Sequence, residues 1–370
     1  MNLSVVGYGG YVSAGEKNIL DASVEDYFTI LDQNCDKLEC YIPINKGEQV
    51  TSTKYVFEVH SFEKTRGGYL KLLFQLIRTD NKDVLFLFMP TCSRLAPFLP
   101  VLRRLYKKIV IYLADDPFAF TNTIQLSSIP LLSMYYRMVC ESYLRRADGI
   151  LVRGKYLEAL GVRYNSRVEI TSPQYTLLEK RRSVREKGDN DYTILTFSRL
   201  VMAKGYGVLF RALRNILDRE SIEIRLLLAG DGLGRQEIEL MAREIIPDVD
   251  YSFLGWVSST KEKQVLWEQA DLHVLATTTT EGVPRCIDEA CLVSVPTIAT
   301  KVGGVPYEYT NGEVCLIEPG SVQALTDALE GFLFRNYAMD FSDGIAFRER
   351  YLRAMKLAGQ QHYDFISSLQ

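Results

Sequence analysis

Histidine is scarce in this chain of 370 residues, with single copies at His60, His273 and His362. So few histidines exclude a His-rich metal site and argue against a catalytic triad built on histidine. His273 lies inside an apolar run and is expected to be a hydrogen-bonded core residue. His60 ends a strand candidate, where it could contact a substrate, although a structural hydrogen bond is the favoured interpretation.

The chain also lacks an excess of basic residues, a long apolar run and a CxxC pair. Its net charge is -3 and its pI is near 5.8, which argues against general nucleic-acid binding. No apolar stretch is long enough to span a bilayer, and residues 1–7 enter a strand without a basic signal-peptide head. The seven scattered cysteines are expected to be reduced core thiols. We therefore expect a cytoplasmic protein, with peripheral contact at the inner face of the membrane as a further option.

What the chain does have is the composition of a globular protein with room for two domains. Hydrophobic residues make up 47% and charged residues 24%. A charge-dense segment with no large apolar residue except Val184 spans residues 179–191, as expected of an interdomain linker. We predict a first domain at 1–178, a second at 192–345, and a helical tail at 346–370 that packs on the first domain.

Apolar strand-like runs alternate with helical patterns in both halves. This alternation predicts parallel βαβ units and doubly wound sheets, which bind ligands beyond the carboxyl ends of their strands. The strands expected in the first half are Leu3–Val6, Tyr55–Val59, Val84–Phe88, Ile109–Leu113 and Gly149–Val152. Those expected in the second half are Tyr192–Phe197, Ile222–Ala229, Tyr251–Leu254, Leu272–Ala276, Thr297–Thr300 and Val314–Ile317.

The segment from Glu281 to Glu289 places two carboxylates around an expected loop-to-helix junction. Pro284 suits the first turn of that helix, so Glu281 would project from the loop and Glu289 from the second helical turn. Eight helical steps would separate them by about 12 Å, which is too far for a shared proton or metal ion. We expect them to hold two parts of one extended, hydroxyl-rich ligand.

Two cations, Arg199 and Lys204, follow the expected strand at 192–197, and Gly205 and Gly207 then open a helix. Basic side chains beside a helix N-terminus make a good diphosphate site, because backbone amides and the helix dipole add to their field. Taken alone, the same residues are explained equally well as a solvated basic turn.

Two further patterns in the second half are weaker. The glycines from Gly230 to Gly234 resemble a dinucleotide fingerprint, but Arg235 occupies the third glycine position, which favours a tight turn near a ligand crevice. Asp248 and Asp250 match a metal-binding D-x-D pattern, yet they precede a strand at the wrong end of the sheet. A solvated turn is the favoured interpretation of these two acids.

Two motifs of the first half are open to two interpretations each. Asp115 and Asp116 end an expected strand, where they could bind a substrate hydroxyl or cap the next helix, and capping is slightly preferred. Between Arg94 and Lys108 the chain carries five basic residues and no acid, interleaved with apolar side chains. This segment could lie on anionic lipid, whereas the solvated face of a core helix is the favoured interpretation.

Together, the motifs of the second half resemble glycosyltransferase family 4, the group 1 glycosyltransferases of GT-B fold. The match runs in order across residues 192 to about 335, and Glu281 with Glu289 forms the family's Glu-x7-Glu pattern. The other matching pieces are Phe197-Ser198-Arg199-Leu200 with Lys204-Gly205, Ala229-Gly230-Asp231-Gly232, Phe253–Val257, Pro296–Thr300 and Val302–Pro306.

The resemblance implies two Rossmann-like domains with parallel sheets facing a central cleft, and a C-terminal helix that crosses back to the N-terminal domain. It implies that Arg199 and Lys204 bind a diphosphate, that Glu289 accepts hydrogen bonds from a ribose, and that Glu281 lies near the transferred sugar. The further implied donor contacts are Gly9, Gly10, Gly205, Gly230, Val257, Gly282, Val283 and Pro284, with Gly303 and Gly304 offering backbone amides.

The expected activity is that of a metal-independent retaining glycosyltransferase that needs no cofactor. It would move a sugar from a UDP- or GDP-sugar to a glycan or lipid-linked acceptor, in the biosynthesis of a cell-surface polysaccharide. Arg199 and Lys204 would stabilise the leaving diphosphate, with Glu281 nearest the reacting carbon. In front-face attack the leaving phosphate oxygen takes the acceptor's proton, which suits a chain with few histidines.

The first half matches the family less well. Asp115 and Asp116 stand roughly where many relatives carry a histidine, and His60 is a further weak candidate for the acceptor side. Two alternatives stay open. A sugar-nucleotide epimerase of GT-B fold would convert a donor without an acceptor, and a non-catalytic nucleotide-sugar-binding partner would bind the donor without turning it over.

Overall fold

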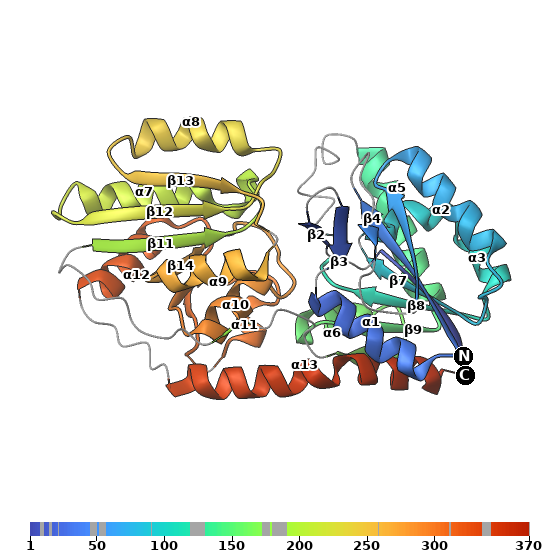
Figure 1. Ribbon diagram of the computed structural model, residues 1–370. Coiled ribbons are helices and arrows are strands. Elements are labelled where there is room, and N and C mark those ends of the chain that lie inside the picture. Colours follow the sequence, from blue (N-terminus) through green and yellow to red (C-terminus); the bar gives the residue numbers. More distant parts are fainter. Residues whose placement is uncertain are drawn as a thin grey trace. The chain divides into compact units, whose positions relative to one another are not determined.

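The computed structural model describes residues 1–7, 11–14, 17–20, 22–44, 50–51, 57–89, 91–118, 130–171, 178–179, 191–257, 259–310, 312–334 and 342–369. The chain divides into two compact units (Figure 1). Unit 1 comprises Met1–Tyr175 and Arg353–Gln370, and unit 2 comprises Thr176–Leu352. Residues 180–190 of the expected linker lie outside the described ranges, and so do Gly9 and Gly10.

Unit 1 is built on a seven-stranded parallel sheet with strand order β10-β9-β8-β7-β1-β4-β6. Its central strands are buried almost throughout, as parallel strands are when helices cover both faces of the sheet. The strands are β1 (Asn2–Val6), β4 (Lys37–Ile44), β6 (Glu58–Glu63), β7 (Val84–Met89), β8 (Lys108–Leu113), β9 (Gly149–Val152) and β10 (Val168–Ile170). A small separate sheet joins β2 (Tyr11–Ala14), β3 (Lys17–Leu20) and β5 (Val50–Thr51).

Different helices cover the two faces of this sheet. One face packs on α2 (Arg66–Arg78), η1 (Thr91–Phe98), α3 (Leu99–Leu105), α5 (Pro130–Arg146) and α6 (Lys155–Gly161). The other face packs on α1 (Ala22–Asn34) and the end of α13 (Ser342–Ser368). Local chemistry sets the start of α2, because the Thr65 hydroxyl accepts a hydrogen bond from the Gly68 amide over 3.1 Å.

Unit 2 carries a six-stranded parallel sheet with strand order β13-β12-β11-β14-β15-β16. Its strands are β11 (Asp191–Phe197), β12 (Glu223–Ala229), β13 (Asp250–Gly255), β14 (Leu272–Leu275), β15 (Thr297–Thr300) and β16 (Cys315–Ile317). Its helices are η3 (Met202–Lys204), α7 (Tyr206–Leu217), α8 (Arg235–Ile245), α9 (Thr260–Gln269), α10 (Arg285–Val293), α11 (Val305–Glu308) and α12 (Val322–Phe334). The apolar stripe of α7 packs against α8, α12 and the sheet.

The two parallel-sheet α/β units confirm the predicted fold class, and the last helix ends within unit 1. The first half departs from expectation in detail. β4 was not predicted, because Lys37, Glu39 and Pro43 interrupt its apolar run, and β6 begins at Glu58 rather than Tyr55. Among the described residues, no helix is long and apolar enough to cross a membrane.

Two of the three histidines are buried in the cores of the two units. In unit 1, the Nδ1 atom of His362 on α13 lies 2.7 Å from the Tyr27 hydroxyl of α1, and its Nε2 atom contacts the Thr171 hydroxyl. In unit 2, the Nδ1 atom of His273 on β14 lies 3.3 Å from the Thr297 hydroxyl. Burial lowers the pKa of each imidazole from 6.5 to about 3. His273 is therefore the core residue that the sequence predicted.

These pKa shifts predict an acid-sensitive core. Below about pH 6.5, His273 binds a proton in the unfolded chain but stays neutral in the folded chain. The free energy of unfolding therefore falls by about 1.4 kcal/mol per pH unit until about pH 3. His273→Leu is expected to remove this contribution. Urea unfolding followed by tryptophan fluorescence reports on unit 2, because Trp256 and Trp267 are the only tryptophans. An unchanged pH slope in the variant would contradict the assignment.

Candidate functional site

The carboxyl ends of β11 and β14 form the topological switch point of unit 2. The chain passes from β11 to β12 and β13 on one side of the sheet, whereas β14 pairs with β11 on the other side. Ligands of doubly wound proteins bind at such a point, because the two following loops diverge. Here the loops are residues 198–205 and 276–284, which the strand order brings together.

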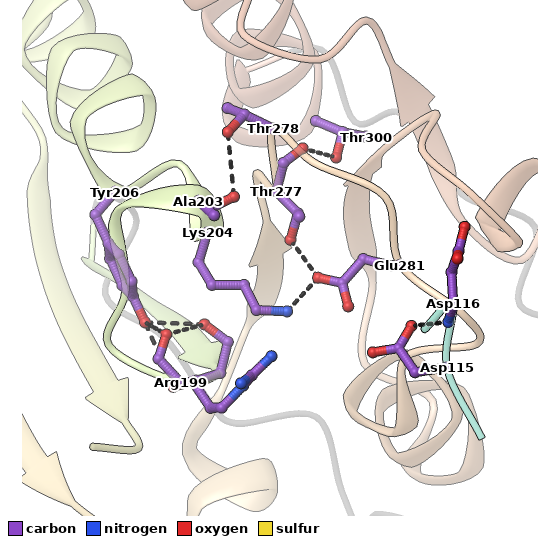
Figure 2. A network of polar contacts seen from close by, with 11 residues as sticks. Asp115, Asp116, Arg199, Ala203, Lys204, Tyr206, Thr277, Thr278, Glu281 and Thr300 are labelled. Atoms are coloured by element: carbon purple, nitrogen blue, oxygen red, sulfur yellow. Dashed lines mark hydrogen bonds and ion pairs between the residues drawn. The ribbon is translucent and has the colours of Figure 1, made fainter. Parts of the chain in front are cut away.

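Lys204 and Glu281 meet between these loops (Figure 2). The Lys204 Nζ atom forms an ion pair with Glu281 Oε1, and the Thr277 hydroxyl donates to the same oxygen over 2.8 Å. Only 11% of the Lys204 side chain and 12% of the Glu281 side chain are exposed, so solvent screens the pair less than it screens a surface pair. Two residues assigned from sequence to separate parts of a ligand are thus direct partners.

Glu281 is also held through its main chain. The Gly304 amide donates to the Glu281 carbonyl oxygen over 3.0 Å. Only glycine permits this approach at position 303, since φ is +50° and a Cβ atom would lie 1.8 Å from that oxygen. The Thr300 hydroxyl donates to the Thr277 carbonyl over 2.6 Å (Figure 2). The loops after β14 and β15 therefore support one carboxylate.

Arg199 lies on the exposed side of the loop that carries Lys204. Within the described part of the chain, its guanidinium group makes no hydrogen bond or ion pair. Figure 2 shows this group on the same side of the loop as the Lys204 ammonium group. The buried Tyr206 anchors this loop, with its hydroxyl 2.9 Å from Ser198 Oγ and 3.4 Å from the Arg199 carbonyl oxygen. Burial raises the pKa of Tyr206 to about 12, so the hydroxyl stays neutral.

Two helices begin at this end of the sheet without a side-chain cap. The N-cap of α7 is Gly205, with φ +73°, and the N-cap of α10 is Pro284. Uncapped first-turn amides and the positive end of each helix dipole attract anions. Pro284 precedes the first helical residue, Arg285, rather than lying within the first turn, and Glu289 projects from the second turn as predicted.

The carboxylate of Glu289 is paired with a lysine that the sequence analysis did not select. Lys263 Nζ on α9 lies 2.8 Å from Glu289 Oε1, with 15% and 5% of the two side chains exposed. The same ammonium group lies 5.4 Å from the centre of the Phe197 ring. A lysine among the mostly polar residues of α9 carries no sequence signal, so only the packing of α9 beside α10 identifies it.

An apolar cluster adjoins Glu289 at the ends of β11 and β13. Val257 and Phe197 are half-buried against it, and Trp267 stacks on Phe197 with ring centroids 5.8 Å apart. Cys286 belongs to the same cluster, and burial raises the pKa of its thiol to about 12, so it is not a nucleophile. This surface offers a flat ligand an apolar contact beside a carboxylate.

Other residues that were predicted to contact the donor also lie in unit 2. Gly230 has φ +137° and donates its amide to the Gly255 carbonyl over 2.8 Å, beside the Val257 turn. Gly282 is buried, and Val283 and Pro284 are half-buried between Glu281 and α10.

The predicted acceptor-side residues belong to unit 1. Asp116 is largely buried: its Oδ1 accepts from the Phe118 amide over 2.8 Å and its Oδ2 from the Tyr156 hydroxyl over 2.7 Å. Asp115 accepts from the Asp116 amide over 2.8 Å. His60 is half-exposed, stacks on Tyr41 and lies 3.5 Å from a Glu58 carboxylate oxygen. Asp116 therefore makes structural hydrogen bonds to a turn and to α6, whereas residues 119–129, where a capped helix would follow, lie outside the described ranges.

No group of three or more His, Cys, Asp or Glu side chains in the described ranges is arranged to hold a metal ion. Of the two acids of the D-x-D pattern, Asp248 lies between α8 and β13, and Asp250 is the first residue of β13. Asp248 pairs with Arg214 over 2.7 Å, and Asp250 pairs with Arg225 over 3.5 Å.

Comparisons with known proteins agree with this geometry. Residues 179–340 match the family model described as glycosyl transferases group 1. The putative teichuronic acid biosynthesis glycosyltransferase TuaC of Bacillus subtilis is 31% identical over 131 residues, which cover 35% of this chain and 30% of that protein. The chain thus spans less than a third of the length of this relative.

Solved structures share the fold at low identity. Sucrose-phosphate synthase of Thermosynechococcus elongatus matches with TM-score 0.78 and 14% identity, over 100% of this chain and 99% of that chain. Anabaena HepE, solved in complex with UDP-glucose, matches with TM-score 0.69 and 15% identity over 100% of both chains. Residues 179–340 therefore belong to the glycosyl transferases group 1 family, and the fold that carries them is GT-B.

Proposed function

We propose that this chain is a retaining glycosyltransferase that moves a sugar from a nucleoside-diphosphate sugar to a glycan or lipid-linked acceptor. The observation that carries the proposal is the Lys204–Glu281 pair at the switch point, beside an exposed Arg199 and two uncapped helix N-termini. Cations and amides suit a diphosphate, and a carboxylate held next to them suits sugar hydroxyls. The family match of residues 179–340 supports the same activity.

The donor would extend along the carboxyl edge of the unit 2 sheet. Its diphosphate would contact Arg199, Lys204 and the N-terminus of α7, and its sugar would contact Glu281. The ribose hydroxyls would donate to Glu289, and the base would rest on the apolar surface of Val257 and Phe197. The UDP-glucose in the complex with HepE supports a UDP-sugar over a GDP-sugar.

The chemical step needs positive charge rather than a protein base. As the bond between the anomeric carbon and the phosphate oxygen breaks, negative charge grows on the diphosphate, where Arg199, Lys204 and the α7 amides would stabilise it. An acceptor hydroxyl attacks from the face that the leaving group vacates. Its oxygen bonds to the anomeric carbon, and its proton passes to the leaving phosphate oxygen. The configuration is retained, with no metal ion or cofactor in the proposed step.

The acceptor side is assigned to unit 1, with Asp115, Asp116 and His60 as candidate contacts. The similarity to TuaC, a putative teichuronic acid biosynthesis glycosyltransferase, supports polysaccharide biosynthesis as the setting of the reaction. We infer a cell-surface polysaccharide as the product and synthesis in the cytoplasm. The identity of the glycan or lipid-linked acceptor would then distinguish the reaction of this chain from the reactions of relatives with a similar donor-binding unit.

A panel of UDP-, GDP- and ADP-sugars tests the proposal. We expect thermal stabilisation by a UDP-sugar, and release of UDP only when an acceptor extract is present, with the new linkage in the anomeric configuration of the donor by NMR. Conversion of the donor without an acceptor would instead identify an epimerase. Binding without turnover under every acceptor condition would identify a non-catalytic binding partner.

Lys263 is expected to position Glu289 for the ribose. Lys263→Gln should raise the donor KM about tenfold and leave kcat within about twofold, because it removes one charge-assisted hydrogen bond from a buried carboxylate. Lys261→Gln is the matched control, since Lys261 lies on the same helix and is exposed. Equal KM values for the two variants would show that Lys263 does not orient Glu289.

A further inference from the structure

The outer face of α5 in unit 1 is apolar where a solvated helix would be polar. Leu131, Met134, Tyr135 and Met138 are 76%, 56%, 50% and 60% exposed. Their spacing of three, four and seven residues places them on one side of the helix. Cys140, Tyr143 and Leu144 occupy the opposite side and are buried against the sheet. The exposed side chains therefore make no contribution to the core.

A second exposed apolar stripe runs along α2. Leu70, Phe74 and Ile77 are 47%, 58% and 38% exposed, while the core-facing side of the helix carries residues such as Leu72 and Leu76. η1 and α3 connect the two helices, since η1 contacts α2 and α5 and α3 contacts α2, and Val101 of α3 is 44% exposed. One layer of helices on one side of the sheet thus bears eight exposed large apolar side chains, an arrangement that marks an interaction surface.

This helical layer is also strongly basic. Residues 66–78, 94–108 and 130–146 together contain eleven Lys and Arg residues and one acid, Glu141, although the whole chain has a net charge of -3. Some of these cations have carboxylate partners: Arg103 pairs with Asp148, and Arg137 and Arg145 with Glu141. Lys107 likewise pairs with Asp83, and Lys108 with Asp148. In the described part of the chain, no carboxylate pairs with the exposed Arg66, Lys71, Arg78, Arg104 and Arg146.

We propose that this face, the outer surface of α2, η1–α3 and α5, docks on an anionic lipid bilayer. Exposed apolar side chains flanked by cations suit the boundary between acyl chains and headgroups, where the apolar groups insert and the cations meet lipid phosphates. A second copy of the chain is a poorer occupant, because a two-fold contact would bring two basic faces together. The inference is independent of the proposed function, and bilayer docking would give the enzyme direct access to a lipid-linked acceptor.

The surface differs from the one suggested by the sequence. Within residues 94–108, Leu95, Leu99, Leu102 and Tyr106 are buried in the core. The segment is a 3-10 turn followed by a short helix, and it contributes only Val101 as an exposed large apolar side chain. The flanking helices, rather than the basic segment itself, provide the apolar part of the docking face.

Co-sedimentation of the full chain with vesicles tests the proposal. One vesicle preparation contains phosphatidylglycerol and phosphatidylcholine in equal parts, and the other contains phosphatidylcholine alone. We expect binding to the anionic vesicles that weakens with added salt, and at least about tenfold weaker binding to the neutral ones. Leu131→Ser/Met138→Ser should weaken binding about tenfold, and Lys71→Gln and Arg78→Gln should each weaken it about fivefold.

Matched controls separate this surface from general effects of charge and hydrophobicity. Leu240→Ser and Arg243→Gln alter exposed residues of α8 in unit 2 and should leave vesicle binding unchanged. Circular dichroism confirms that each variant is folded. Three results would overturn the proposal: no binding to anionic vesicles at low salt, equal binding by the α5 double variant, or self-association that this variant abolishes without any vesicle binding.

Discussion

Lys204→Met is expected to lower kcat about a thousandfold, with a smaller change in the donor KM. Lys204 supplies a charge that matters most when the diphosphate leaves, and removing one preorganised donor of this kind typically costs two to three orders of magnitude in rate. The measurement is steady-state release of the nucleoside diphosphate with the donor identified by the sugar-nucleotide panel. Full activity in the variant would rule out a role for Lys204 in the chemical step.

The same substitution has a structural consequence that must be separated from catalysis. It leaves the Glu281 carboxylate largely buried with no cationic partner, which we expect to cost about 3 kcal/mol of unfolding free energy. Lys204→Met/Glu281→Gln removes both charges and keeps the Thr277 hydrogen bond to a side-chain oxygen. The double variant should regain most of the stability and remain inactive. Recovery of activity along with stability would show that Lys204 only supports the fold.

Gly205→Ala is expected to be the most damaging small substitution at the switch point. Gly205 has φ +73°, and a Cβ atom there would lie 1.9 Å from the Ala276 carbonyl oxygen, so the loops after β11 and β14 would have to separate. We expect a loss of about 4 kcal/mol in unfolding free energy, from backbone strain together with this clash, and loss of donor binding. Urea unfolding and donor-induced thermal shift measure the two effects.

Gly320→Ala provides a matched control for backbone strain. Gly320 has φ +75°, and a Cβ atom at this position would meet nothing within 4 Å. The control should therefore cost only about 1 kcal/mol, the penalty of a left-handed alanine, and bind donor normally. Similar losses in both variants would mean that the loops can yield at Gly205, and that the close approach to Ala276 is not needed for the site.

The sequence alone determined the class of the fold and predicted the kind of ligand. In unit 2, apolar runs of strand length alternate with helical stripes such as that of α7, and burial on both faces of a parallel sheet requires this pattern. Arg199, Lys204, Glu281 and Glu289 could be selected because each lies just after a strand or at the start of a helix. The pattern was less clear in unit 1, where polar residues interrupt β4, so this strand was not predicted.

Only the tertiary structure decided which of these residues act on one another. Strand order places β14 beside β11, and this turns Lys204 and Glu281, far apart in sequence, into an ion pair supported by Thr277. The packing of α9 beside α10 brings Lys263 to Glu289. Because the apolar residues near Val101 are buried, the apolar part of the proposed docking face lies mainly on α2 and α5. Sequence periodicity reports which side of an element is buried, whereas contacts between elements depend on how the chain crosses over its sheet.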